Sequence, residues 1–153
     1  MVIGAALHNR AAYLPEAIDS LLAQSFEHFA LILVDDGSTD GTEALGRAYE
    51  RRDSRVRYVR FDERRGMVTA WRTAFEEATT FGGTYFAWGS DHDRWHPNWL
   101  ATLVAALEGH PEVVLTYPLT QRIGPDGVSL AKPARQFETV GITDRRARWT
   151  LLS

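Results

Sequence analysis

Apolar residues recur along the chain with two different spacings, and their alternation predicts the fold. Short apolar runs, typical of strands covered on both faces of a sheet, occur at 2–7, 30–34 and 84–88. A further strand is predicted at 56–61, where Arg57 and Arg60 interrupt the apolar residues and predict a less buried strand. Apolar residues spaced three and four apart predict helices that occupy 14–24, 43–49, 68–78 and 97–109. This β-α alternation predicts an α/β fold, a mostly parallel, doubly wound, Rossmann-like sheet with helices on both faces.

Weaker signals follow the fourth helix. We expect a fifth strand over 113–117, a turn at 124–127 that joins a hairpin, and a further helix that begins at Thr143 or Asp144. Because the last pattern is still apolar near Ser153, we expect residues 1–153 to form a single domain that is truncated at the C-terminus inside a larger fold. Asp40 and Glu43 have the spacing of a capping box, which predicts Asp40 as the N-cap of the second helix.

Composition excludes several classes of function. The chain has 153 residues, a net charge of −3 and no cysteine, so we expect no nucleic-acid partner, disulfide, thiolate zinc site or thiol nucleophile. No apolar run approaches the length of a membrane span. We therefore expect a cytoplasmic protein, or one that is peripheral to the inner face of a membrane.

Carboxylates follow two of the predicted strands. Asp35 and Asp36 end the run at 30–34, and Asp91, His92 and Asp93 follow the run at 84–88. The carboxyl ends of strands are where open α/β sheets bind ligands, so these groups are candidate site residues. Asp35 and Asp36 also fit a simple strand-ending turn, and this alternative stays open at the level of the sequence.

Four segments together resemble family 2 glycosyltransferases of the GT-A fold. These segments are His8-Asn9-Arg10, Leu21 to Phe26, Val34 to Thr42, and Trp88 to Pro97. The segment from Val34 to Thr42 is the most specific of them. The resemblance covers nearly the whole chain and identifies it as the nucleotide-sugar-binding portion of such an enzyme.

The resemblance implies transfer of a sugar from a nucleotide-diphosphate donor to an acceptor hydroxyl, with inversion and with a metal. It implies a nucleotide site made of Ala6, His8, Asn9, Asp35, Asp36, Arg65 and Asp91, with Arg64 and Arg72 also near the donor. It places Asp91, His92 and Asp93 in the metal-binding region, and it puts the family's catalytic base beyond Ser153. The chain departs from the family pattern at Ala5-Ala6, at His8 and at His92.

The implied chemistry is consistent with these residue types. Mn²⁺ or Mg²⁺ needs only one or two protein carboxylates when phosphates supply the other ligands, and the imidazole of His92 favours Mn²⁺. An aspartate can accept the N3–H of uracil or thymine, which favours a UDP- or dTDP-sugar. The acceptor is expected to be a carbohydrate or another hydroxyl compound.

Two other classes of function and one assembly question remain. A non-catalytic regulatory domain of the receiver type needs a lysine near the acidic site, but the only lysine is Lys132, beyond the predicted strands. A nucleotidyltransferase needs a glycine-rich loop and a lysine after the first strand, where this chain has His8-Asn9-Arg10. The apolar residues 149–152 are compatible with further chain or with a homo-oligomer.

Overall fold

The structure is a computed structural model that describes residues 1–124 and 126–130. The chain divides into two units, Met1–Val114 and Leu115–Ser153. All the helices and strands named below belong to the first unit.

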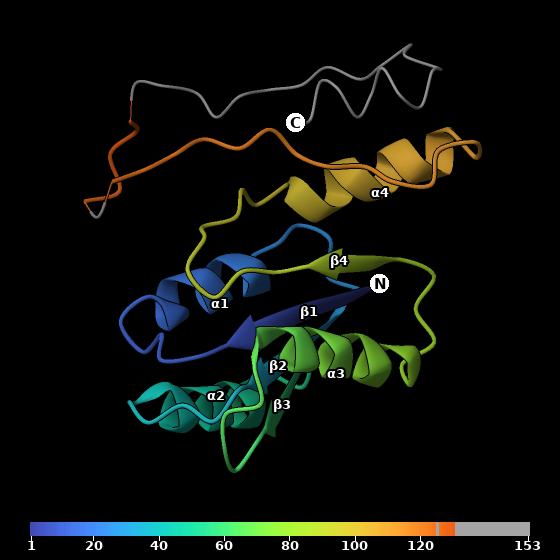
Figure 1. The fold of residues 1–153 in the computed structure, drawn as a ribbon. Coiled ribbons are helices and arrows are strands. Elements are labelled where there is room, and N and C mark those ends of the chain that lie inside the picture. The colour runs from blue at the N-terminus through green and yellow to red at the C-terminus, as the bar shows by residue number, and fades with distance from the viewer. Residues whose placement is uncertain (125, 131–153) are drawn as a thin grey trace, which may run out of the picture. The chain divides into compact units, whose positions relative to one another are not determined.

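Parallel strands form the centre of the first unit (Figure 1). The strands are β1 (Val2–Leu7), β2 (Ala30–Asp35), β3 (Val56–Arg60) and β4 (Phe86–Trp88). They pair in parallel in the order β3-β2-β1-β4. The predicted parallel α/β sheet is therefore confirmed.

Helices connect these strands and cover the sheet. They are α1 (Leu14–Leu22), α2 (Thr42–Arg52), α3 (Met67–Thr79) and α4 (Trp99–Gly109). Each matches a helix predicted from apolar spacing, with ends that differ by a few residues. Pro97 precedes α4 rather than opening it, and its carbonyl accepts the backbone N–H of Ser25 at 2.8 Å.

Side chains along each strand point alternately to the two faces of the sheet, and this divides the core into two layers. On one face, Ile3, Leu31 and Leu33 pack with residues of α1, α2 and α4. On the other face, Ile32 and Val34 pack with the small residues of α3. Successive side chains of a strand point to opposite faces, so apolar runs such as Leu31–Val34 supply both layers.

Gly4 allows α3 to approach the sheet closely. A Cβ atom at this position of β1 would lie 2.9 Å from the ring of Phe86 and 3.2 Å from the Cβ of Ala74. The glycine is therefore required by packing, since any side chain would push these neighbours away.

Three local predictions need correction or fall outside the description. Gly41, not Asp40, is the N-cap of α2, but Oδ1 of Asp40 still accepts the N–H of Thr42, the first residue of the helix, at 2.9 Å. Residues 113–117 form no strand, because an apolar run becomes a strand only when its backbone pairs, and no described ladder includes them. The helix predicted from Thr143 or Asp144 lies outside the described residues.

The turn predicted at 124–127 is supported by its described residues. The N–H of Gly127 donates to the carbonyl of Gly124 at 2.9 Å, and Ile123 forms an antiparallel bridge with Ser129. Pro125 itself lies outside the described residues.

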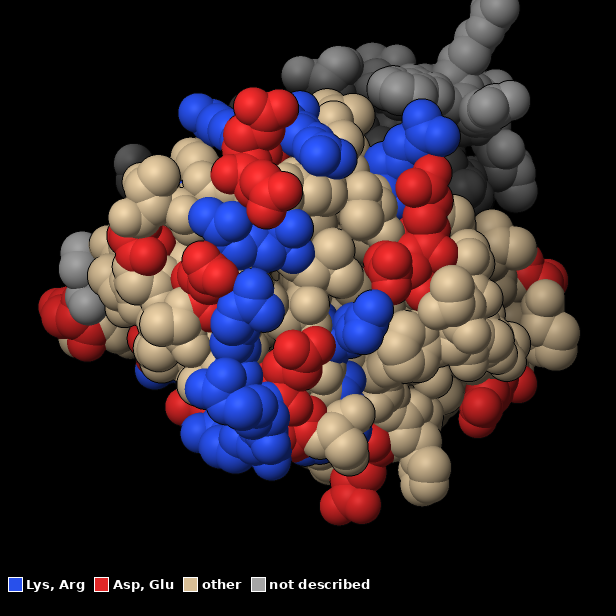
Figure 2. All heavy atoms as spheres, turned by 90° about the horizontal axis from the view of Figure 1, so that it is seen from below, with Lys and Arg blue, Asp and Glu red and all other residues tan. Residues whose placement is uncertain are grey.

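The surface on the side of α2 and β3 carries charges of both signs. Figure 2 shows basic and acidic side chains interspersed over this side of the molecule. Ion pairs account for part of the pattern: Glu43 lies 3.0 Å from Arg47 and 3.1 Å from Arg60. Among the helices that the structure describes, none has the length and apolar character needed to cross a bilayer.

Candidate functional site

The loops that follow the parallel strands gather at one edge of the sheet. The N–H of Asp36 donates to the carbonyl of Leu7 at 2.9 Å, which joins the ends of β2 and β1. The N–H of Phe61 donates to the carbonyl of Asp35 at 2.9 Å, which joins β3 to β2. This is the carboxyl edge, where ligands bind to open α/β sheets.

Asp36 joins the loop after β2 to the start of α3. Its Oδ1 accepts the backbone N–H of Arg65 at 2.6 Å, and both carboxylate oxygens lie 3.0 Å from the N–H of Gly66. The guanidinium of Arg64 forms an ion pair with the same carboxylate, with Nε 3.8 Å from Oδ2. The side chain of Arg64 is 68% exposed, whereas that of Asp36 is 3% exposed.

Asp35 is a fully buried carboxylate on the other face of the sheet. Its Oδ1 accepts the backbone N–H of Ser38 at 2.9 Å and the Ser38 hydroxyl at 2.5 Å. Its Oδ2 accepts the hydroxyl of Tyr58 at 2.5 Å. The pKa of Tyr58 is raised, mainly by burial and to a smaller extent by this hydrogen bond to Asp35.

The loop after β1 is held against the loop after β2. Nδ1 of His8 lies 2.8 Å from the backbone carbonyl of Asp36. Since a carbonyl only accepts, Nδ1 is the donor in this contact. Asn9 has a φ of 52° and donates its N–H to the Ser38 hydroxyl at 3.0 Å. Ala6 lies on β1, two positions before His8, and is half-buried.

The acidic segment after β4 brings two of its three predicted ligands into contact. Oδ1 of Asp91 lies 2.6 Å from Nδ1 of His92, and Oδ2 lies 3.6 Å from Nε of Arg10. The Asp91 side chain is 11% exposed, and Asp93 is exposed. In residues 1–124 and 126–130, no three His, Cys, Asp or Glu side chains are gathered closely enough to hold a metal ion by themselves.

The arginines named from the sequence have different surroundings. The guanidinium of Arg65 lies 4.8 Å from the centre of the Phe61 ring, and its side chain is at the surface. Arg72 pairs instead with Glu76, one turn further along α3, at 2.7 Å. Arg65 therefore belongs to the loop that Asp36 holds, while Arg72 is engaged on the helix surface.

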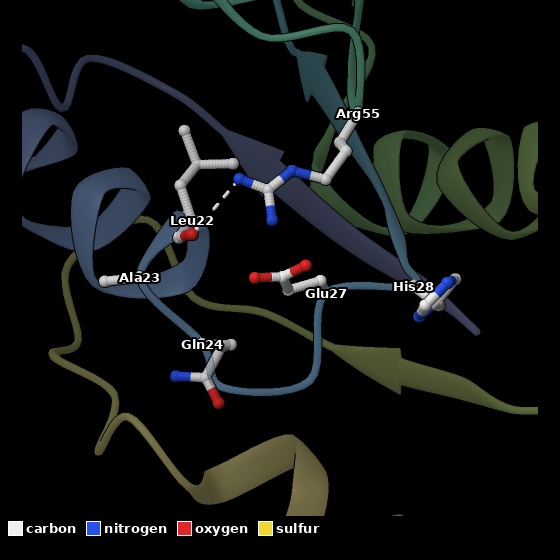
Figure 3. Close-up of a pocket in the computed structure, with 6 residues that line it drawn as sticks. All are labelled: Leu22, Ala23, Gln24, Glu27, His28 and Arg55. Atoms are coloured by element: carbon white, nitrogen blue, oxygen red, sulfur yellow. Dashed lines mark hydrogen bonds between the residues drawn. The ribbon is translucent and has the colours of Figure 1, made fainter.

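A separate depression of about 600 Å³ lies at the opposite, amino edge of the sheet (Figure 3). It is lined by Leu22, Ala23, Gln24, Glu27, His28 and Arg55. Arg55 donates to the carbonyl of Leu22 at 3.1 Å and pairs with Asp53 at 2.8 Å. These polar groups are engaged in joining α1 to β3, and the depression is distinct from the strand-end loops.

Tyr58 and Arg10 contact site residues but were not predicted from the sequence. The alternation of β3 could have indicated which face Tyr58 occupies, but not that its hydroxyl meets Asp35. Arg10 belongs to a segment that was singled out, yet its approach to Asp91 depends on the pairing of β1 with β4. Both contacts join segments that are distant in the sequence.

Comparison with known proteins is consistent with this geometry. TuaG of Bacillus subtilis, whose name assigns it to teichuronic acid biosynthesis as a glycosyltransferase, is 36% identical over 88 residues. The match covers 58% of this chain and 34% of TuaG. EpsE of Bacillus subtilis, also named as a glycosyltransferase, is 32% identical over 105 residues, which cover 68% of this chain and 37% of EpsE. The matched regions thus span about a third of these relatives.

Solved structures share the fold. Staphylococcus aureus TarS in complex with UDP superposes with a TM-score of 0.64 at 21% identity, over 72% of this chain and 32% of TarS. The mannosyltransferase PcManGT from Pyrobaculum calidifontis, in complex with GDP-Man and Mn²⁺, gives a TM-score of 0.62 at 26% identity. That match covers 69% of this chain and 31% of PcManGT.

The sequence model of the family described as "Glycosyl transferase family 2" matches residues 3–149. This range contains every described helix and strand apart from Val2, the first residue of β1, and every strand-end loop of the candidate site. The chain therefore belongs to glycosyl transferase family 2.

Proposed function

We propose that this chain binds the donor of a glycosyltransferase that moves a sugar from a nucleotide diphosphate to an acceptor hydroxyl, with inversion. The observation that carries the proposal is the position of Asp36, a carboxylate at the carboxyl edge that joins the loops after β2 and β3. His8 and Asn9 reach the same place from β1. This arrangement gives a nucleotide one wall from each of three strands.

The proposed partner of Asp36 is the base of the nucleotide, with UDP- or dTDP-sugars favoured. Backbone N–H groups of Arg65 and Gly66 fix the orientation of the carboxylate. Arg64 pairs with it at 3.8 Å and is mostly exposed, so a base that donates its N3–H could take the place of this side chain. The UDP and UDP-GlcNAc complexes of TarS support this choice of nucleotide.

A divalent cation, Mn²⁺ or Mg²⁺, fits the residues after β4. Asp91 would hold it, with His92 or Asp93 as the second protein ligand, because these cations keep water and phosphate oxygens as their other ligands. Asp91 lies 2.6 Å from Nδ1 of His92 and 3.6 Å from Nε of Arg10, so its carboxylate faces the segment proposed to hold the ion. Such an ion would balance the charge of the departing diphosphate. The complex of PcManGT with GDP-Man and Mn²⁺ supports a metal in this fold.

The proposed acceptor is a hydroxyl of a carbohydrate or of a similar compound. The name of TuaG, which assigns it to teichuronic acid biosynthesis, supports a carbohydrate acceptor. Because the matched regions span only about a third of such relatives, transfer is proposed for the whole enzyme. Donor binding is the part of the reaction that this chain can be tested for directly.

Thermal unfolding of the chain tests the proposal. UDP, dTDP, GDP and CDP would each be added with and without Mn²⁺. A nucleotide at about 100 times its dissociation constant adds roughly 2.7 kcal/mol, which raises the midpoint by roughly 5 to 10 °C. We expect a Mn²⁺-dependent shift with UDP or dTDP. A folded protein that no nucleotide stabilises would contradict donor binding.

A further inference from the structure

A chain of hydrogen bonds runs from β3 to the loop after β1. The hydroxyl of Tyr58 donates to Oδ2 of Asp35 at 2.5 Å. Oδ1 of Asp35 accepts the hydroxyl of Ser38 at 2.5 Å, and the Ser38 oxygen accepts the N–H of Asn9 at 3.0 Å. Tyr58, Asp35 and Ser38 are all buried, so little water is available to replace any of these bonds.

The number of protons and lone pairs on each group determines which group donates and which accepts in these hydrogen bonds. A hydroxyl has one proton, and the proton of Ser38 is directed to the Asp35 carboxylate. The lone pairs of Ser38 are therefore free to accept from Asn9. The Asp35 carboxyl group is the common acceptor, with the Tyr58 hydroxyl on one oxygen and the Ser38 hydroxyl on the other.

Tyr58 is held in place by α2. Gly46 leaves the space that the Tyr58 ring occupies, since a Cβ atom at position 46 would overlap the ring. The backbone N–H of Tyr58 donates to Oε1 of Glu50 at 2.8 Å, and the guanidinium of Arg47 lies 5.6 Å from the ring centre. The hydroxyl thus reaches Asp35 from a fixed position, and its raised pKa keeps it protonated as a donor.

Asn9, at the other end of this series of hydrogen bonds, has an unusual backbone conformation. Asn9 has a φ of 52°, in the left-handed region that non-glycine residues seldom occupy. Its N–H is bound by Ser38, and its Oδ1 accepts the N–H of Thr39 at 2.9 Å. Asparagine tolerates this region better than most residues, and the bonds to Ser38 and Thr39 hold the backbone of Asn9 in it.

We propose that Tyr58 is a positioning residue of the nucleotide site, acting through Asp35 and Ser38 to fix the loop that contains His8 and Asn9. The proposal rests on the proposed function of that loop in donor binding. In the proposed arrangement, Asp35 acts by binding Ser38, whereas Asp36 is the carboxylate that contacts the base. Tyr58 itself stays beneath the site and touches no donor atom.

Tyr58→Phe tests the proposal, and Tyr49→Phe is its matched control. Both tyrosines are 6% exposed, and the hydroxyl of Tyr49 also donates to an aspartate, Asp19, at 3.0 Å. That contact joins α2 to α1 rather than the strand-end loops. The two measurements are the exchange rate of the Asn9 amide without nucleotide and the dissociation constant of UDP or dTDP with Mn²⁺, well below the unfolding midpoint.

We expect Tyr58→Phe to speed exchange of the Asn9 amide and to weaken nucleotide binding by roughly fivefold or more, the scale of one hydrogen bond. Tyr49→Phe should leave both values unchanged even where it lowers the unfolding midpoint equally. Ser38→Ala should reproduce the effect of Tyr58→Phe, and Ser38→Thr, which keeps the hydroxyl, should restore binding. If Tyr58→Phe fails to fold, the comparison of Ser38→Ala with Ser38→Thr still tests the proposal.

The outcomes separate this proposal from the proposed function. Wild-type protein that binds no nucleotide would overturn donor binding and the positioning role together. Wild-type binding that a folded Tyr58→Phe variant leaves intact would overturn the positioning role alone. Where Tyr58→Phe fails to fold, binding that Ser38→Ala leaves intact would do the same. Equal effects of Tyr58→Phe and Tyr49→Phe on the Asn9 amide would also overturn it, because they would reflect a general loss of stability.

Discussion

The N–H of Gly66 lies 3.0 Å from each carboxylate oxygen of Asp36. Gly66 is the N-cap of α3 and has a φ of 92°, so the contact ties the end of β2 to the beginning of a helix thirty positions later. A carboxylate near a helix N-terminus is favoured by the unpaired N–H groups and the helix dipole. The residue proposed to meet the base therefore also determines how α3 begins.

Asp36→Asn should destabilise the protein. The amide has one acceptor oxygen and places N–H groups where the backbone N–H groups of Arg65 and Gly66 already point. Loss of these buried bonds costs about 1 to 3 kcal/mol, which thermal unfolding can measure. Asp62→Asn is the control, because Asp62 is exposed and lies in the connection between β3 and α3 that contains Arg65 and Gly66. This variant should change the unfolding midpoint little. An unfolding midpoint that Asp36→Asn changes as little as the control would show that the Asp36 contacts contribute no stability.

Gly37→Ala should also destabilise the protein. Gly37 has a φ of 65°, and a Cβ atom there would lie 2.7 Å from the backbone nitrogen of Arg64. The strain and the overlap together should cost at least about 1 kcal/mol in denaturant unfolding. Gly41→Ala is the comparison, since Gly41 has a φ of −72° and its nearest neighbour would be 3.5 Å away. A cost for Gly41→Ala as large as that for Gly37→Ala would contradict the role of this close approach.

Stability should fall in alkaline solution because of Tyr58. Its pKa is raised in the folded state, by burial and then by the bond to Asp35. The folded state therefore retains a proton that the unfolded state loses above about pH 10, so stability falls as the pH rises. One such group contributes a slope of about 1.4 kcal/mol per pH unit.

Tyr58→Phe should remove that contribution. Its free energy of unfolding, measured by urea titration from pH 8 to pH 11, should fall less steeply than that of the wild type. Tyr49, whose pKa is raised by burial and by Asp19, should leave a residual slope in this variant. Parallel curves for wild type and Tyr58→Phe would contradict the raised pKa of Tyr58.

Asp91→Ala should abolish the Mn²⁺-dependent part of the stabilisation by nucleotide. Asp91 contacts His92 and Arg10, so its loss removes the carboxylate around which the proposed site is built. The measurement is the difference in unfolding midpoint with and without Mn²⁺ at a fixed UDP concentration. Glu27→Ala, which removes an acid at the opposite edge of the sheet, should retain the full difference. A metal-dependent shift that survives in Asp91→Ala would place the ion elsewhere.

The sequence alone determined the order and type of the helices and strands in the first unit. Apolar runs such as Leu31–Val34 fill both faces of a covered sheet, and the spacing of Leu14, Ile18 and Leu21 fits only one side of a helix. Such signals are local and survive in any correct fold. The strand predicted over 113–117 was wrong because the prediction used only local apolar character. That character does not show whether another strand pairs with the segment.

The sequence also indicated which segments carry the chemistry, but the tertiary structure decided what each residue contacts. Asp35 and Asp36 are adjacent in sequence, yet strand alternation directs Asp35 to Tyr58 and Ser38, while Asp36 reaches Arg65 and Gly66. The partners Tyr58 and Gly66 lie 23 and 30 positions away. Contacts of this kind depend on the register of parallel strands, which no local pattern of hydrophobic and polar residues encodes.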